Sequence, residues 1–249
     1  MFGMAGETEF DLRFQLFQIP VRVHPIFWIS SAMMVWNGDN PAQTVLGVLC
    51  ILVSVLIHEL GHAVVIRRFG YPPEIVLYVL GGYATSAHFP FRRALAVSIA
   101  GPLAGLASAA IIYVAGRTVL WNTIGDYPQL QYIFTILMFG SLTVNLLNLI
   151  PVLPLDGGQI MAACIRQYGP RGTDRFELAL KTSVAISAVV CLWGAHCHSR
   201  DIAFFPFLLY SWLPPIDAFL LYSLQPDPQF QAIFMGYLCA NSLIALKRF

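Results

Sequence analysis

The chain has 249 residues, of which 57% are hydrophobic and only 11% are charged, and its formal net charge is +1. Soluble domains carry about 25% charged residues, so this composition is typical of an integral membrane protein. The sequence lacks the basic stripe with interleaved aromatic residues that nucleic-acid-binding proteins use, and we expect no nucleic-acid partner. Its five cysteines form no CxxC pair, which argues against a disulfide scaffold.

Two apolar segments in the first third of the chain are candidates for transmembrane helices. A bilayer core about 30 Å thick requires about 20 apolar residues per helix. Val23–Trp36 is a short candidate, with Pro25 suited to a first helical turn. Ala42–Phe69 is long enough to cross with residues to spare. Residues 1–22 would then form an N-terminal cytoplasmic segment.

A change of pattern follows the second apolar segment. Pro72 and Pro73 end the helix, Ile75–Leu80 is β-prone, Gly81 and Gly82 can form a turn, and Tyr83–Phe89 follows. This pattern predicts a β-hairpin at the membrane surface or dipping into it. Bare strand edges are not tolerated in lipid, so we expect protein or a wet cavity to cover the hairpin.

Further apolar segments predict an all-α polytopic membrane protein with about six transmembrane helices and a small membrane-associated β-hairpin after the second. The remaining spans are expected at Arg92–Ala115, Leu130–Ile150, Phe176–Ala195 and Ile202–Leu224. Residues 23–224 would form the core. Residues 225–249 would form an amphipathic or membrane-associated C-terminal segment, and the pattern does not decide whether residues 230–246 span the membrane or lie on it.

The distribution of basic residues predicts the orientation. With the N-terminus inside, twelve of the 14 lysines and arginines fall on the cytoplasmic side, and only Arg117 and Arg200 fall outside. Such a bias is strong evidence for orientation in multi-pass proteins. It places His62 and Asp156 toward the cytoplasmic ends of their segments, so the two residues are expected at one depth.

The segment His58-Glu59-Leu60-Gly61-His62 lies inside the long apolar stretch, where Glu59 is the only acid between residues 42 and 66. A carboxylate at that depth costs at least a few kcal/mol in lipid, so it should have a partner or a function. On a helix, His58 and His62 lie on one face and can converge on one Zn²⁺. The adjacent glutamate can take a proton from water at the metal, as in metalloproteases.

A catalytic zinc site requires a third protein ligand and one open position for water. Asp156 is the best candidate because it follows an apolar span and precedes two glycines. A helix-capping or turn aspartate is the alternative reading of that position. For His58, Glu59 and His62, the alternative is a set of structural core residues, which the cost of burying three polar side chains in lipid disfavours.

Three segments together resemble the site-2 protease family of zinc intramembrane metalloproteases. They are His58-Glu59-Leu60-Gly61-His62, then Ala100-Gly101-Pro102-Leu103-Ala104-Gly105, and then Asn148-Leu149-Ile150-Pro151-Val152-Leu153-Pro154-Leu155-Asp156-Gly157. The resemblance covers roughly residues 20–160, in the order that the family shows, and Gly81-Gly82 falls where family members carry a membrane-associated β-hairpin.

The resemblance implies a zinc-dependent endopeptidase that carries out regulated intramembrane proteolysis, cutting membrane-protein substrates in or near their transmembrane segments within the lipid bilayer. It implies that His58, His62 and Asp156 bind one Zn²⁺ per chain, that Glu59 is the general base, and that Asn148 binds the substrate backbone. Gly105 departs from the asparagine often found there, which weakens any polar role at that position.

Two other functions remain open from the sequence. A prenyl-protein-type membrane zinc peptidase would need a glutamate as third ligand, and Glu177 lies instead among basic residues. A non-catalytic membrane scaffold stabilised by zinc would have no use for Glu59. The substrate, the regulatory signal, the oligomeric state and the host membrane are not encoded in any motif that we recognise.

Overall fold

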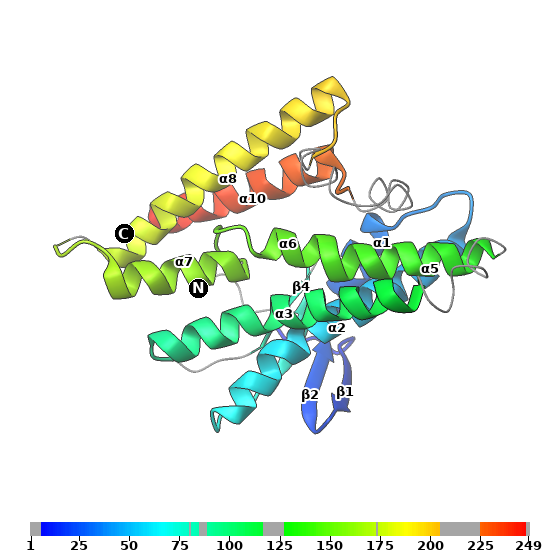
Figure 1. The fold of residues 1–249 in the computed structure, drawn as a ribbon, viewed down its shortest axis with the longest axis horizontal. Helices are drawn as coiled ribbons and strands as arrows, with labels where there is room; N and C mark the ends of the chain where they lie inside the picture. The colour runs from blue at the N-terminus through cyan, green and yellow to red at the C-terminus, as the bar shows by residue number, and fades with distance from the viewer. Residues whose placement is uncertain are drawn as a thin grey trace. The chain divides into compact units, whose positions relative to one another are not determined.

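The structure is a computed structural model that describes residues 6–79, 81–84, 89–116, 127–172, 174–204 and 225–247 (Figure 1). It divides into two compact units, Met1–Asn145 and Leu146–Phe249. The first unit holds a small sheet and the helices around it, and the second holds helices.

Five of the described helices are long and apolar enough to cross a membrane. They are α2 (Pro41–Arg68), α3 (Phe91–Ala115), the continuous helical stretch Pro128–Asn148, α8 (Arg175–Arg200) and α10 (Pro228–Leu246). The predicted class, a helical polytopic membrane protein with a small sheet, is confirmed. Most of the predicted span at 202–224 lies outside the described residues. The undecided segment at 230–246 forms α10, with the length of a span.

The sheet is larger than the predicted hairpin. Strands β1 (Leu12–Leu16), β2 (Ile19–Val23), β3 (Ile75–Tyr78) and β4 (Gly81–Ala84) pair in the order β1-β2-β3-β4. The two N-terminal strands were not predicted. Strand β2 runs parallel to β3, and the other pairs are antiparallel. Gly81 and Gly82 lie in β4 rather than in the turn, because Tyr78 pairs with Gly81.

The first predicted span is only partly helical. Helix α1 (Pro25–Met34) has ten residues, which rise about 15 Å, half of a bilayer core. Strand β2 precedes it, and the two elements together run along α2. Arg67 donates to the carbonyl of Phe17 at the tip of the β1–β2 hairpin, and the N–H of Asn37 donates to Thr44. Residues 44–67 of α2 span about 35 Å, so a strand and a short helix replace one long helix.

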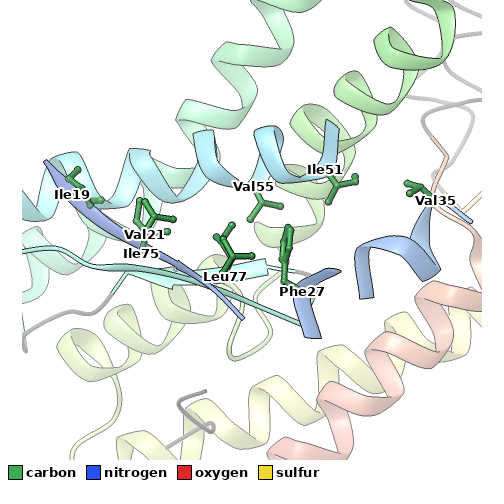
Figure 2. Packing of buried hydrophobic residues seen from close by; sticks show 10 residues of the cluster. Ile19, Val21, Phe27, Val35, Ile51, Val55, Ile75 and Leu77 are labelled. Carbon is green, nitrogen blue, oxygen red and sulfur yellow. The ribbon is translucent and has the colours of Figure 1, made fainter. Parts of the chain in front are cut away.

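Apolar side chains fill the space between α2, α1 and the sheet. Figure 2 shows them following α2 from Ile19 and Val21 on β2, past Leu77 and Phe27, to Val35 beyond α1. Val55 and Ile51 of α2 pack against them. Most of these side chains are almost fully buried. The sheet is therefore anchored to the length of α2 that carries the histidine motif.

The fourth predicted span contains a wide turn. Helix α5 (Pro128–Met138) continues into η2 (Phe139–Thr143), a π-helical turn, and then into α6 (Val144–Asn148). Both α2 and α3 pack against η2. Wide turns of this kind occur often at functional sites. Asn145 is the second residue of α6, two positions after the end of η2.

The second unit consists of α7 (Asp156–Tyr168) and the pair α8 and α10. The helix α7 was not predicted. In α8, Gly194 allows close approach to α10, because a Cβ there would lie 3.0 Å from the nitrogen of Ala232. The hydroxyls of Ser183 and Ser242 meet at 3.2 Å between the two helices, and Ser183 accepts a hydrogen bond from the Leu153 N–H.

Candidate metal centre

Helix α2 brings two imidazole rings together. His58 and His62 lie one turn apart, and their Nε2 atoms are 3.1 Å from each other. The ring planes are 81° apart, in an edge-to-face arrangement. Both side chains are buried within an apolar helix. The convergence expected from the spacing of four residues is therefore present.

The other nitrogen of each ring is held by an oxygen. The Nδ1 of His62 lies 2.7 Å from the carbonyl oxygen of Val97 on α3. A carbonyl only accepts, so this nitrogen carries the proton. The Nδ1 of His58 lies 2.7 Å from Oδ1 of Asn145, whose Nδ2 donates to two carbonyls and so fixes which end of the amide faces the ring. When neutral, each ring in this tautomer presents a lone pair on Nε2.

This arrangement fits a zinc ion. With both rings neutral and protonated on Nδ1, the two Nε2 lone pairs would face each other at 3.1 Å and repel, and a cation between them would remove the repulsion. Two nitrogen ligands about 2.05 Å from one tetrahedral Zn²⁺ lie about 3.3 Å apart. The observed separation of Nε2 atoms needs little adjustment to match. Outer hydrogen bonds of this kind fix the ring orientation of metal-binding histidines.

Glu59 lies beside the pair. Its side chain is buried, with 2% of its surface exposed, and its Oε1 lies 4.0 Å from Nε2 of His58. A carboxylate buried in an apolar helix is costly unless it interacts with a cation or a proton. A carboxylate beside metal-binding nitrogens can accept a proton from water at the metal.

Three glycines make the space that the site occupies. A Cβ at Gly61 would lie 2.4 Å from the carbonyl oxygen of Ala100, so this glycine lets α2 and α3 approach closely. A Cβ at Gly101 would lie 2.2 Å from Nε2 of His62. At Gly105, the Cβ would collide with the side chain of Asn145. On α3, Gly101 thus leaves space for the His62 ring, and Gly105 leaves space for the Asn145 amide.

The other two expected site residues belong to the second unit. Asp156 is the first residue of α7 and is half-buried; Leu155, not Asp156, occupies the N-cap position. The backbone folds tightly over this turn, since a Cβ at Gly157 would lie 2.1 Å from the carbonyl oxygen of Leu149. Asn148 ends α6 and is half-buried. The structure thus brings His58, Glu59 and His62 together in the first unit.

Sequence reasoning missed Asn145. Its contact with His58 joins residues 87 positions apart, which no local pattern reveals. One signal was available: an amide within an apolar span needs a partner or a function. A prenyl-protein peptidase would require a glutamate as third ligand; Glu177, which the sequence places among basic residues, forms an ion pair of 2.7 Å with Lys181 one turn along α8.

Comparisons with known proteins agree with this geometry. The model of peptidase family M50 matches residues 122–190, which include Asn148 and Asp156. A zinc metalloprotease of Methanocaldococcus jannaschii is 30% identical over 185 residues, covering 73% of this chain and 52% of that protein. Stage IV sporulation protein FB of Bacillus subtilis is 29% identical over 179 residues, covering 70% and 57%. These matches relate the chain to peptidase family M50, the site-2 protease family.

The fold agrees with this family. A site-2 protease from Methanocaldococcus jannaschii superposes with a TM-score of 0.55 at 24% sequence identity, over 91% of this chain and 95% of that one. The chain spans about half the length of the curated relatives it matches. Within a site-2 protease fold, the His58–Glu59–His62 group of α2 is the candidate metal centre.

Proposed function

We propose that this chain is a zinc-dependent intramembrane endopeptidase that hydrolyses peptide bonds in or near the transmembrane segments of other membrane proteins. One observation carries the proposal: two converging histidine Nε2 atoms, 3.1 Å apart, lie beside a buried carboxylate in an apolar helix. The family and the names of the relatives, zinc metalloproteases among them, support it.

We assign three ligands to one zinc ion per chain: His58, His62 and Asp156. The first two offer the paired Nε2 atoms. Asp156 is supported by its chemistry, because two histidines and a carboxylate are a common catalytic zinc set with one position left open. As the first residue of α7 it also faces the positive end of a helix dipole, which stabilises the ionised, ligand form of the carboxylate.

Zinc held there would polarise the substrate carbonyl and lower the pKa of water at the site toward about 7. Glu59 then has two tasks. Its carboxylate accepts a proton from the attacking water and returns that proton to the leaving amine nitrogen as the peptide bond breaks. Because Glu59 is almost fully buried, few water molecules compete for that proton.

Asn148 is proposed to bind the backbone of the substrate, since an amide can both donate to a carbonyl and accept from an N–H. The substrate is a segment of a membrane protein that reaches the site from the bilayer. The distribution of basic residues supports an active site facing the cytoplasm, because Arg67 and Arg68 end α2 just beyond His62.

The substitution Glu59→Gln tests the proposal. It removes the base and keeps the size of the side chain, so we expect cleavage to fall at least 100-fold with zinc content unchanged. The measurement is cleavage of a panel of tagged single-span membrane proteins co-expressed with the chain. Glu177→Gln, a surface glutamate paired with Lys181, is the matched control and should cut normally. A Glu59→Gln variant that cleaves as fast as the parent chain would refute the assignment.

A further inference from the structure

We propose that Asn145 is a positioning residue, which holds His58 in the tautomer that can bind zinc. The inference rests on the proposed function and names a residue outside its assigned ligands, base and substrate-binding group. Two neighbouring features take part: carbonyls of the π-helical turn η2 orient the Asn145 amide, and Gly105 leaves space for it.

The orientation of the Asn145 amide is fixed by its own hydrogen bonds. The side chain is buried, with 1% of its surface exposed. Its Nδ2 donates to the carbonyl oxygens of Gly140 at 3.2 Å and Ser141 at 2.9 Å, both in η2. Rotating the amide by 180° would place its oxygen against two carbonyls, which also only accept. The oxygen must therefore face His58.

That oxygen decides where His58 carries its proton. Oδ1 of Asn145 lies 2.7 Å from Nδ1 of the ring and can only accept, so the proton sits on Nδ1 and the lone pair sits on Nε2. Without the acceptor, a neutral imidazole is free to place its proton on Nε2, where it would block the metal. The bond also fixes the rotation of the ring, and Nε2 then points at Nε2 of His62.

Gly105 provides the space for this amide. A Cβ at position 105 would lie 2.1 Å from Nδ2 and 2.3 Å from Oδ1 of Asn145. The two positions therefore compete for one volume between α3 and α6. The sequence has glycine at position 105, with no polar side chain. In the structure, the amide of Asn145 on α6 occupies the space next to that glycine.

The two ligands differ in this respect. The backbone carbonyl of Val97 fixes His62, and no side-chain substitution removes it. A single side chain fixes His58. A substitution at Asn145 therefore changes the tautomer of His58 and leaves the hydrogen bond that holds His62 in place.

The test measures zinc affinity of the purified full chain in detergent, by competition with a chelator. We expect Asn145→Leu, which keeps the volume and removes the acceptor, to weaken zinc binding 10- to 100-fold. The visible spectrum of the Co²⁺-loaded variant should shift, because the ligand field depends on ring orientation. Ser141→Ala is the matched control: it alters a buried side chain of η2 and leaves the carbonyl that Asn145 uses.

A second pair of variants serves if the leucine variant does not fold. Asn145→Ala should lose zinc affinity, and adding Gly105→Asn should restore much of it, because an asparagine at 105 delivers its oxygen into the vacated space. Equal zinc affinity in the parent and Asn145→Leu would overturn the inference, as would equal losses in Asn145→Leu and Ser141→Ala. A parent chain that binds no zinc would instead refute the proposed function itself.

Discussion

The hydrogen-bond acceptors at Nδ1 of His58 and His62 determine which nitrogen of each ring can bind a metal. Each Nδ1 meets an acceptor at 2.7 Å, from α3 for His62 and from α6 for His58. The pairing of Nε2 atoms follows from helix geometry, and the sequence alone predicts it. The partners behind the rings come from 35 and 87 positions away, so only the fold reveals them.

Away from the histidines, the carboxylate of Asp11 stabilises the β1–β2 hairpin. The side chain of Asp11 is covered and accepts hydrogen bonds from the hydroxyl of Thr8 at 2.6 Å and from Arg22 at 2.9 Å. The Thr8 hydroxyl first, and then the Arg22 guanidinium, hold the pKa of the Asp11 carboxyl well below its usual range, against the opposing effect of burial. Since β2 carries Arg22 and leads into α1, this contact holds the β1–β2 hairpin together just before α1.

A pH dependence follows from the lowered pKa. A carboxyl with a lower pKa in the folded chain stabilises the fold above its unfolded value of about 3.9, and this contribution fades as the pH falls toward the folded value. Asp11→Asn should therefore lower the midpoint of thermal unfolding at pH 7, and the gap from the parent should narrow below about pH 4. Glu7→Gln, in an exposed pair with Arg13, should change little. A gap that widens on acidification would contradict this account.

At the scale of elements, local composition predicted the long helices well. Twenty or more apolar residues leave few alternatives in a membrane protein, as α2 and α3 illustrate. The pairing of β2 with β3 was not predicted because β3 lies more than 50 residues further along the chain. Of β2, only Val23 falls inside the predicted apolar segment Val23–Trp36, and the rest of the strand lies in the predicted N-terminal cytoplasmic segment.

Small residues also determine how the elements meet. Gly61 on α2 and Gly101 on α3 would each clash with the facing helix if they carried a Cβ. Small residues at facing positions let two helices approach closely, as α2 and α3 do here. The sequence could not predict that the Gly101 contact is with a histidine ring. Helix α7 was missed because the proline-rich segment before it suggested an end to regular structure.

At the scale of the whole molecule, the distribution of charge predicts a single orientation. The loop after α2 and the tip of the β1–β2 hairpin lie together, as the bond from Arg67 to Phe17 shows, and both carry basic residues nearby. Twelve basic residues share that predicted side. The alternation of the predicted segments places the end of α8, with Arg200, on the other side.

Reporter insertions test this orientation. An alkaline phosphatase reporter, active only outside the cytoplasm, should be inactive when inserted between residues 70 and 73 and active when inserted near residue 202. A green fluorescent reporter at the same positions, as the control for expression, should give the opposite pattern. Activity of the phosphatase after α2 would place the candidate metal centre on the outer side.

The central claim is that one zinc ion is held by His58, His62 and Asp156. Its most direct test is the metal content of the purified full chain combined with X-ray absorption at the zinc edge. The account predicts one zinc per chain with two imidazole ligands and an oxygen shell, retained in Glu59→Gln and lost in His58→Ala and Asp156→Ala. A purified parent chain without zinc, or an Asp156→Ala variant with the parent's zinc spectrum, would contradict it.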